Sequence, residues 1–233
     1  MTQNEMAPET QASPTASKSP QATREALVQA GADLFAAHGF DGATTDAIAR
    51  AAGVNKAMIS YHFGGKAGLY EEVLALLFAE AGQRLQELKE SRQPADLQLR
   101  RFIAIFAGSL ARHPNLPPLI LREAMSGGGH LNPKAYPLML DLVGVITGIL
   151  KRGQEEGTLR DVNPLLAHFS IAGSLVFYFA TAPFRERMAA EGRFPGELPP
   201  LDDVVRHVQD LMSLGLASRA AGTLVWRRKE GSS

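Results

Sequence analysis

One stretch of sequence decides the fold of the N-terminal part of this chain: Ile48-Ala49-Arg50-Ala51-Ala52-Gly53-Val54-Asn55-Lys56, residues 48–56. Its alanines allow two short helices to approach closely, and Gly53 can adopt the positive φ that a tight turn requires. Val54 can fill the angle between the two helices. The pattern is typical of a helix-turn-helix, whose second helix lies in the major groove of DNA. A plain corner between two helices uses the same chemistry, so spacing alone leaves both interpretations open.

Helical patterns run on both sides of this stretch. The preceding segment has an apolar face at three- and four-residue spacing, formed by Leu27, Ala30, Gly31, Leu34 and Phe35. Thr23 is predicted to cap the start of this helix and Gly39 to end it. The chain as a whole predicts an all-α fold without strands. We expect nine helices, at about residues 23–38, 45–52, 56–63, 66–91, 94–113, 116–126, 133–156, 164–183 and 201–220.

The composition divides the chain into four parts. Residues 1–20 are rich in Ser, Thr, Pro, Gln and Ala, so we expect a disordered N-terminal arm, either a functional tail or a start-site artefact. Residues 21–68 are predicted to form a DNA-binding domain, and residues 69–222 a ligand-binding and dimerisation domain. Residues 223–233 are expected to be a flexible tail, in which Arg227-Arg228-Lys229 is solvated.

Net charge and cysteine content limit the classes of function. Lys and Arg total 24, as do Asp and Glu, so a DNA-binding surface would have to be locally positive. The absence of cysteine excludes disulfides and thiolate metal sites. No apolar stretch approaches the roughly 20 residues that a membrane span needs, and no signal-peptide pattern is visible. We therefore expect a cytoplasmic protein with no membrane partner.

The flanks of the turn resemble the TetR family of transcriptional repressors. The resemblance covers roughly residues 23–70 and rests on Gly39-Phe40, Thr44-Thr45-Asp46-Ala47-Ile48-Ala49, Ala52-Gly53-Val54-Asn55-Lys56, Tyr61-His62-Phe63-Gly64-Gly65-Lys66 and Leu69-Tyr70. The run from Tyr61 to Lys66 is similar to the branch that includes the CecR-type regulators. The resemblance implies a three-helix DNA-binding head on a nine-helix architecture, with a helical ligand-binding and dimerisation bundle as its body.

In this family the third helix reads bases and its surroundings contact phosphates. Carried over, the groove-facing residues would be Asn55, Lys56, Ala57 and Ser60, since Asn and Lys bond base edges and Ala packs on a thymine methyl. Residues placed at the DNA backbone would be Thr44, Thr45, Tyr61, His62 and Lys66. Ile59 and Phe63 would instead hold the third helix to the head.

Two departures from the family pattern affect these assignments. Many relatives carry an aromatic residue where Ser60 stands, so one contact is expected to have shifted to Tyr61. The charge of residues 23–68 is also balanced, with Arg24, Arg50, Lys56 and Lys66 matched by Glu25, Asp33, Asp41 and Asp46. We therefore expect modest non-specific affinity for DNA with a shallow salt dependence.

The second part of the chain sets isolated polar residues among apolar ones. Apolar walls with a few polar groups are typical of a small-molecule pocket, although core packing explains any single apolar residue equally well. The isolated polar groups include Glu123, His168 and Ser174. The candidate ligand-binding residues are Phe102, Phe106, Arg122, Met125, His130, Met139, Phe169 and Phe177. The resemblance implies a pocket between helices four to eight, where a small, largely apolar effector drives the heads apart.

The last two predicted helices resemble the dimer-forming pair of the family. Small residues would permit close contact across a two-fold axis, and leucines would supply apolar area: Ala172, Gly173, Ser174, Leu211, Leu214 and Leu216. Dimerisation also follows from the mechanism, because one short recognition helix gives too little specificity. We expect a homodimer that binds a palindromic operator in double-stranded DNA.

A catalytic function finds no support in the motifs. Gly64-Gly65-Lys66 lacks the earlier glycine and the following Ser or Thr of a phosphate-binding loop, and the six histidines show no paired metal-ligand spacing. We expect no cofactor, no metal and no enzymatic activity. The alternative function is that of a helical ligand-binding or adaptor protein that has lost DNA binding. The retention of Thr44, Lys56, Tyr61 and Lys66 argues against it.

Overall fold

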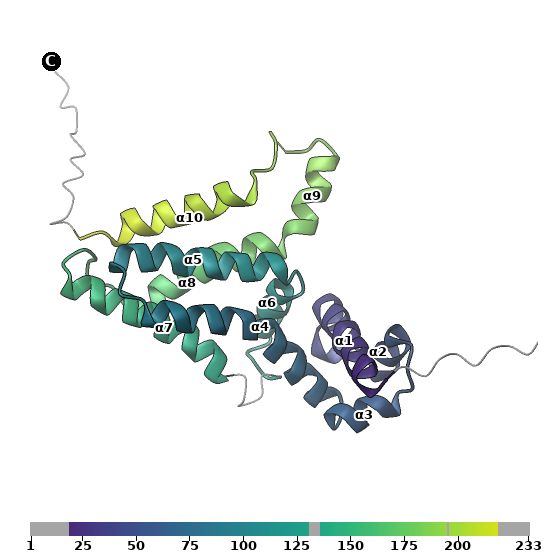
Figure 1. Cartoon of the computed structure of the whole chain (residues 1–233). Helices are drawn as coiled ribbons and strands as arrows, with labels where there is room; N and C mark the ends of the chain where they lie inside the picture. The colour runs from purple at the N-terminus through teal and green to yellow at the C-terminus, as the bar shows by residue number, and fades with distance from the viewer. Residues whose placement is uncertain (1–18, 131–135, 195, 219–233) are drawn as a thin grey trace, which may run out of the picture.

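The computed structural model describes residues 19–130, 136–194 and 196–218, and these residues form ten helices. Figure 1 shows a head at one end, made of α1 (Pro20–Gly42), α2 (Thr45–Ala52) and α3 (Ala57–Phe63). The long helix α4 (Lys66–Glu90) runs from the head into the helical body. In the described residues β structure is limited to one isolated bridge, between Leu159 and Ala217. The all-α prediction is confirmed.

The start of α1 differs from the prediction. Ser19 and Pro20, assigned to the N-terminal arm, begin the helix: the Ser19 hydroxyl accepts a hydrogen bond from the Ala22 N–H at 3.2 Å. Thr23, the predicted cap, is buried within the helix. A serine followed by proline is itself a strong helix start, because the ring suits the first turn. The rest of the arm and the predicted tail lie outside the described residues.

The head has a continuous apolar core that also includes the first turns of α4. Its members come from all four helices and are almost fully buried: Leu27, Phe35, Ile48, Ile59, Leu69 and Tyr70. Gly39 has a φ of 74° and breaks the regular path of α1, as predicted. Phe40 follows this break and packs edge-on against Tyr70 at 5.2 Å between ring centroids. Phe40 thus packs against the head core after the break in α1.

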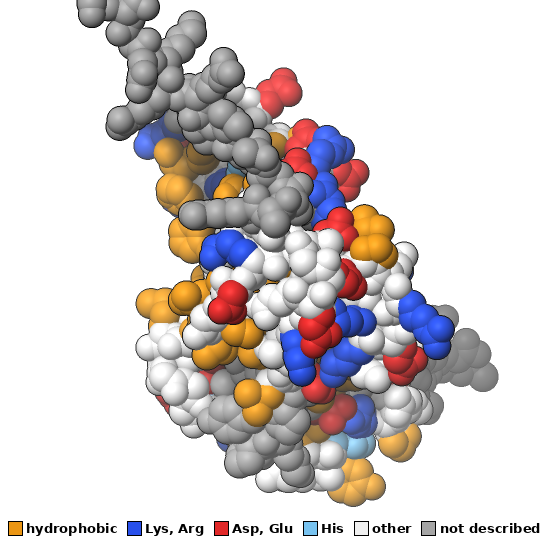
Figure 2. Space-filling view, turned by 90° about the vertical axis from the view of Figure 1, so that its left-hand side faces the viewer, with side chains coloured by type: hydrophobic (Ala, Val, Ile, Leu, Met, Phe, Trp, Pro, Cys, Tyr) orange, Lys and Arg blue, Asp and Glu red, His pale blue; other side chains and the backbone are white. Residues whose placement is uncertain are grey.

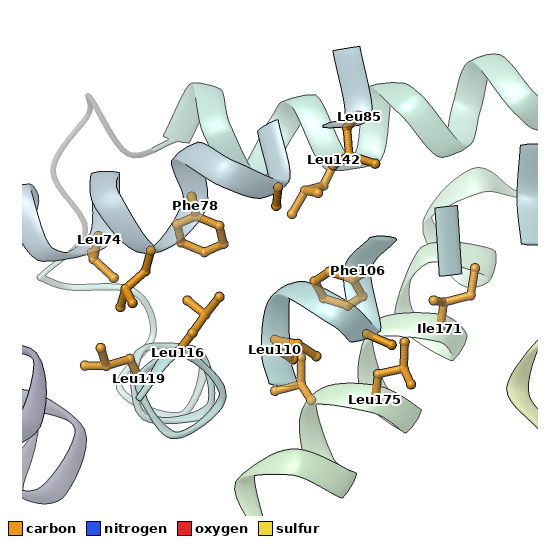
Figure 3. Close-up of a cluster of buried hydrophobic side chains, with 14 of the residues drawn as sticks. Leu74, Phe78, Leu85, Phe106, Leu110, Leu116, Leu119, Leu142, Ile171 and Leu175 are labelled. Atoms are coloured by element: carbon orange, nitrogen blue, oxygen red, sulfur yellow. The ribbon is translucent and has the colours of Figure 1, made fainter. Parts of the chain in front are cut away.

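Helices α5 (Ala95–Arg112), α6 (Leu116–Met125), α7 (Tyr136–Glu155), α8 (Pro164–Ala180) and α10 (Leu201–Leu216) complete most of the body. Figure 3 shows its apolar core, to which α4 to α8 all contribute. In this view Phe78 and Phe106 lie in the middle of the cluster, with Leu142 above them and Leu116 below Phe78. Each such side chain stabilises the fold by roughly 1.5–3 kcal/mol through burial. Most boundaries agree with the predicted ones to within three residues.

Helix α9 (Ala182–Ala190) was not predicted. The eighth predicted helix was expected to end near Pro183, but α8 stops at Ala180 and a second helix begins after Thr181 at an angle of 50°. Pro183 lies within the first two positions of α9. Proline is tolerated there, because a backbone N–H at the start of a helix has no hydrogen-bond partner within the helix. None of its residues is buried, so α9 has no apolar stripe from which sequence periodicity could identify it.

Within the described ranges, no single helix is both long and apolar enough to cross a membrane; α8 and α9 meet that test only as a bent pair.

Candidate DNA interface and effector cavity

The turn between α2 and α3 is fixed by backbone and side-chain hydrogen bonds. The Thr44 hydroxyl accepts from the Ala47 N–H at 3.1 Å and caps α2. Gly53 ends α2 in the left-handed conformation, with a φ of 64°. The side-chain oxygen Oδ1 of Asn55 accepts a hydrogen bond from the Ala57 N–H at 2.8 Å, and this bond orders the start of α3. Val54 packs against the head core, as its role in the predicted turn requires.

Helix α3 presents one exposed face and one buried face. Ile59 is 1% exposed and Phe63 packs against the core, so both hold the helix to the head. The opposite face carries the exposed residues Asn55, Lys56, Ala57, Ser60 and Tyr61. We call this exposed surface the α3 face. It carries hydrogen-bond donors and acceptors, the methyl group of Ala57 and the ring of Tyr61, which is 76% exposed. These groups can contact base edges and phosphates in a major groove.

Three positive charges of the head, those of Arg24, Lys56 and Lys66, have partners within the chain. Lys56 Nζ lies 2.7 Å from Asp46 Oδ2, and both side chains are more than half exposed. Lys66 Nζ lies 4.4 Å from the centre of the Phe40 ring and 3.5 Å from the Asp41 carbonyl oxygen. Arg24 pairs with Glu72 at 2.6 Å. The contacts of Lys66 with Phe40 and Asp41 turn its side chain towards the end of α1, which no sequence pattern indicated.

The remaining backbone-contact candidates surround the α3 face. Thr44 is exposed at the start of α2, and Thr45 is half-buried beside it. His62 is half-buried, with its ring 4.9 Å from that of Tyr61. The structure thus places all nine candidate DNA residues on α2, on α3 or at their ends and at the start of α4.

The head meets the body through a polar contact, which we call the junction. Arg122 of α6 donates to the carbonyl oxygens of Ala36 and Ala37 at 3.0 and 2.7 Å. The break at Gly39 leaves these carbonyls near a helix end, where intrahelical partners are lost. His130 stacks on Phe40 at 4.6 Å between ring centroids.

Glu123 connects the junction to the interior of the body. The Tyr70 hydroxyl donates to Glu123 Oε1 at 2.6 Å. His130 lies between two carboxylates, with Nδ1 3.4 Å from Glu123 Oε1 and Nε2 3.3 Å from Asp41 Oδ2. Burial raises the pKa of Tyr70 well above its ordinary value, and the hydrogen bond and negative charge of Glu123 raise it further. Tyr70 therefore stays protonated and acts as the donor.

Two adjoining cavities lie among helices α4 to α8. The larger has a volume of about 500 Å³ and the smaller about 260 Å³. They share the lining residues Phe78, Ile120, His168, Phe169, Ala172 and Val176. Burial lowers the pKa of His168 below its usual 6.5, so its imidazole is neutral near pH 7. A largely apolar wall with few polar groups fits a small organic ligand.

The seven candidate ligand-binding residues whose side chains the structure describes separate into four groups. Phe106 and Phe169 line the cavities. Phe102 is 1% exposed and packs in the core, stacked on Phe106 at 6.3 Å. Three candidates, Arg122, Met125 and His130, instead line a separate cavity of about 340 Å³ at the junction. Apolar spacing on a helix cannot tell a cavity wall from the core, because both faces are equally hydrophobic.

Of the last two candidates, the structure describes the side chain of Phe177 only, and Phe177 does not line the cavities. Phe177 is 63% exposed on the surface of α8, and the Met139 side chain lies outside the described residues. Lining residues that sequence reasoning missed include Leu74, Phe78, Leu119, Ile120 and Leu142. Glu123 and His168 also line the larger cavity, and the signal for them was their polarity among apolar neighbours.

Comparisons with known proteins agree with this architecture. Residues 27–73 match the model of bacterial regulatory proteins of the tetR family, and residues 94–193 match a tetracyclin repressor-like C-terminal domain. The chain is 27% identical to the HTH-type transcriptional repressor NicS of Pseudomonas putida over 67% of this chain and 75% of that protein. It is 24% identical to the HTH-type transcriptional regulator RutR of Escherichia coli, over 87% and 94% of the two chains.

A solved structure, that of the hemolysin II transcriptional regulator HlyIIR, has the same fold. It superposes with a TM-score of 0.64 at 22% identity, covering 84% of this chain and 99% of that one.

Proposed function

Because this chain belongs to the TetR family of bacterial transcriptional regulators, which are not enzymes, we propose that it represses transcription by binding a near-palindromic operator as a homodimer. We propose further that a small, largely apolar effector in the adjoining cavities releases it from DNA. Regulators of this family bind DNA and small-molecule effectors and are usually dimers. The finer resemblance to CecR-type regulators stays a prediction, as does the division at residue 68, which falls inside α4.

The observation that carries the proposal is the α3 face. Its exposed residues lie on a helix that is anchored from behind by Ile59 and positioned by the capped turn at Gly53. A short rigid helix with polar groups on its outer side has the size and chemistry to enter a major groove. We propose that Asn55, Lys56, Ala57 and Ser60 contact bases. The DNA backbone would be contacted by Thr44, Thr45, Tyr61, His62 and Lys66.

Apolar residues on the outside of the body support a dimer through α8 and α10. Leu166, Phe169 and Phe177 of α8 are each more than 60% exposed, and Leu214 of α10 is 65% exposed. Figure 2 shows hydrophobic side chains gathered on one side of this end of the body and charged ones on the other. Contiguous exposed apolar surface of this kind marks a protein–protein interface. A homodimer would bury it and pair the two recognition helices.

The position of Glu123 supports communication between cavity and head. Glu123 lines the larger cavity and also the junction cavity, so one side chain borders both. A ligand that binds more tightly to a splayed arrangement of the heads than to the DNA-binding one would release DNA in proportion to that difference. We place this activity in the cytoplasm, where the operator would be found.

Selection of bound duplexes from a random DNA library tests the proposal directly. We expect enrichment of a near-palindrome, and a changed sequence preference for Ser60→Ala. Lys151→Ala is the matched control, since this exposed residue lies on α7, away from the head. Absence of any enriched sequence would favour the adaptor alternative. Sedimentation of the free protein as a monomer at micromolar concentration would refute the paired-groove mechanism.

A further inference from the structure

A buried carboxylate oxygen in the body has no hydrogen-bond partner among the residues that the structure describes. Glu123 is 5% exposed, and its Oε1 accepts the hydrogen bond from Tyr70, but no described group donates to Oε2. The neighbouring Arg122 cannot serve it, because its guanidinium is engaged by the carbonyls of α1. Leaving a buried polar group unpaired is costly, and such groups in native proteins usually have a ligand, an ion or a water.

The charge of the cavities indicates which ligand would pair with this oxygen. Among the described residues that line the two adjoining cavities, the ionisable side chains are those of Glu123 and His168. His168 is neutral near pH 7 because burial lowers its pKa, and its Nδ1 also lacks a hydrogen-bond partner within the described ranges. No described lysine or arginine lines either cavity. The cavity wall is therefore apolar with one local negative charge, which disfavours an anionic ligand.

We propose that the effector is a hydrophobic amine, whose apolar part fills the cavities and whose protonated nitrogen donates to Glu123. This inference rests on the proposed sensing function and narrows its ligand class. Glu123 Oε2 and His168 Nδ1 are both enclosed in the structure. On ligand binding the Glu123 carboxylate would turn towards the cavity, so that the nitrogen supplies the donor that Oε2 lacks and compensates the buried charge. The neutral His168 would accept a second N–H once its Nδ1 is exposed. The shared walls of Phe78, Phe169 and Val176 would surround the apolar part.

The same pairing would couple ligand binding in the cavities to the position of the head. Glu123 is the hydrogen-bond acceptor of Tyr70 and faces His130, which in turn contacts Phe40 and Asp41 of the head. A cation at Glu123 competes with both partners for the carboxylate. Its binding therefore weakens contacts that fix the head relative to the body, which is what a release mechanism requires.

Calorimetric titration of the full chain with three eight-carbon probes tests the ligand class. The probes are n-octylammonium, n-octanol and n-octanoate, which share an apolar part and differ in charge. We expect octylammonium to bind at least about tenfold more tightly than octanoate, as for a charge-assisted hydrogen bond in a buried site. Glu123→Gln should abolish this preference yet leave octanol binding unchanged. Glu155→Gln, at an exposed site on α7, should retain the preference.

The outcomes separate this inference from the proposed function. Octanoate binding as tightly as octylammonium, or a preference that survives in a folded Glu123→Gln chain, overturns the amine assignment but leaves the repressor mechanism intact. Binding of none of the probes overturns the cavities as the sensing site. The comparison of probes on the unaltered chain holds even if the variant fails to fold.

Discussion

Replacement of Asp46 by Asn tests how the α3 face acquires its affinity for DNA. Lys56 and Asp46 form an ion pair with a 2.7 Å separation, and their side chains are 56% and 67% exposed. An exposed pair contributes about 0–1 kcal/mol to stability, so its loss will hardly affect folding. For DNA binding, however, Asp46 competes with the DNA for Lys56 and repels nearby phosphates. We therefore expect the Asp46→Asn variant to bind DNA more tightly.

The size of the effect follows from the electrostatics of an exposed site. A carboxylate about 6 Å from a phosphate repels it by roughly 0.7 kcal/mol in water, and the release of Lys56 adds a contribution of similar size. The sum, somewhat over 1 kcal/mol, corresponds to about a tenfold gain in affinity at low salt. If the freed Lys56 reaches a phosphate, the slope of log affinity against log salt becomes steeper by about 0.9.

Fluorescence anisotropy with a selected operator and an unrelated duplex, at several salt concentrations, measures both quantities. Asp203→Asn is the matched control, because it removes the same charge from an exposed residue on α10. It should change neither the affinity for DNA nor the salt slope. Tighter binding to both duplexes supports the interpretation. If Asp46→Asn binds no better than the control, or binds worse, then the Lys56–Asp46 pair does not limit DNA binding and the reasoning is refuted.

Three further predictions concern packing, titration and assembly. Gly153→Ala should destabilise the chain by about 1–3 kcal/mol in urea unfolding, because a Cβ there would lie 2.4 Å from the buried Leu159 side chain. Lowering the pH below about 6.5 should reduce the free energy of unfolding. The reason is that His168 takes up a proton in the unfolded chain at a higher pH than in the folded chain, where burial lowers its pKa. In the His168→Gln variant the free energy of unfolding should fall less on acidification. Leu214→Glu should raise the dimer dissociation constant at least about tenfold in sedimentation, because it charges the exposed apolar surface of α10.

Each of these predictions has an internal comparison. Gly148→Ala, on the same helix in open space, should stabilise the chain by up to about 1 kcal/mol, so equal effects at both glycines would contradict the packing argument. An unchanged acid sensitivity in His168→Gln would assign the proton uptake to another group. Leu97→Glu, at a 46% exposed leucine of α5, should leave the dimer intact; dissociation by both leucine variants would point to general destabilisation instead.

The sequence by itself determined the local structure of the head. Gly53 and the alanines around it act within a few residues, and the turn formed as predicted. The cap by Thr44 is equally local, although the cap predicted for α1, Thr23, was wrong. The anchoring of α3 by Ile59 and Phe63 also followed from their four-residue spacing. Helix α9 escaped prediction because its exposed residues carry no apolar period.

Only the tertiary structure decided which polar groups act together. The sequence places three polar residues close together, Arg122, Glu123 and His130, and we interpreted them as parts of one pocket. In the fold, Arg122 and His130 point towards the head, and Glu123 lies between the head and the cavities. Lys66 likewise contacts Phe40, which lies 26 residues before it in the chain. Side-chain partners that lie tens of residues away depend on how helices cross, and helical periodicity specifies which face is apolar but not what that face meets.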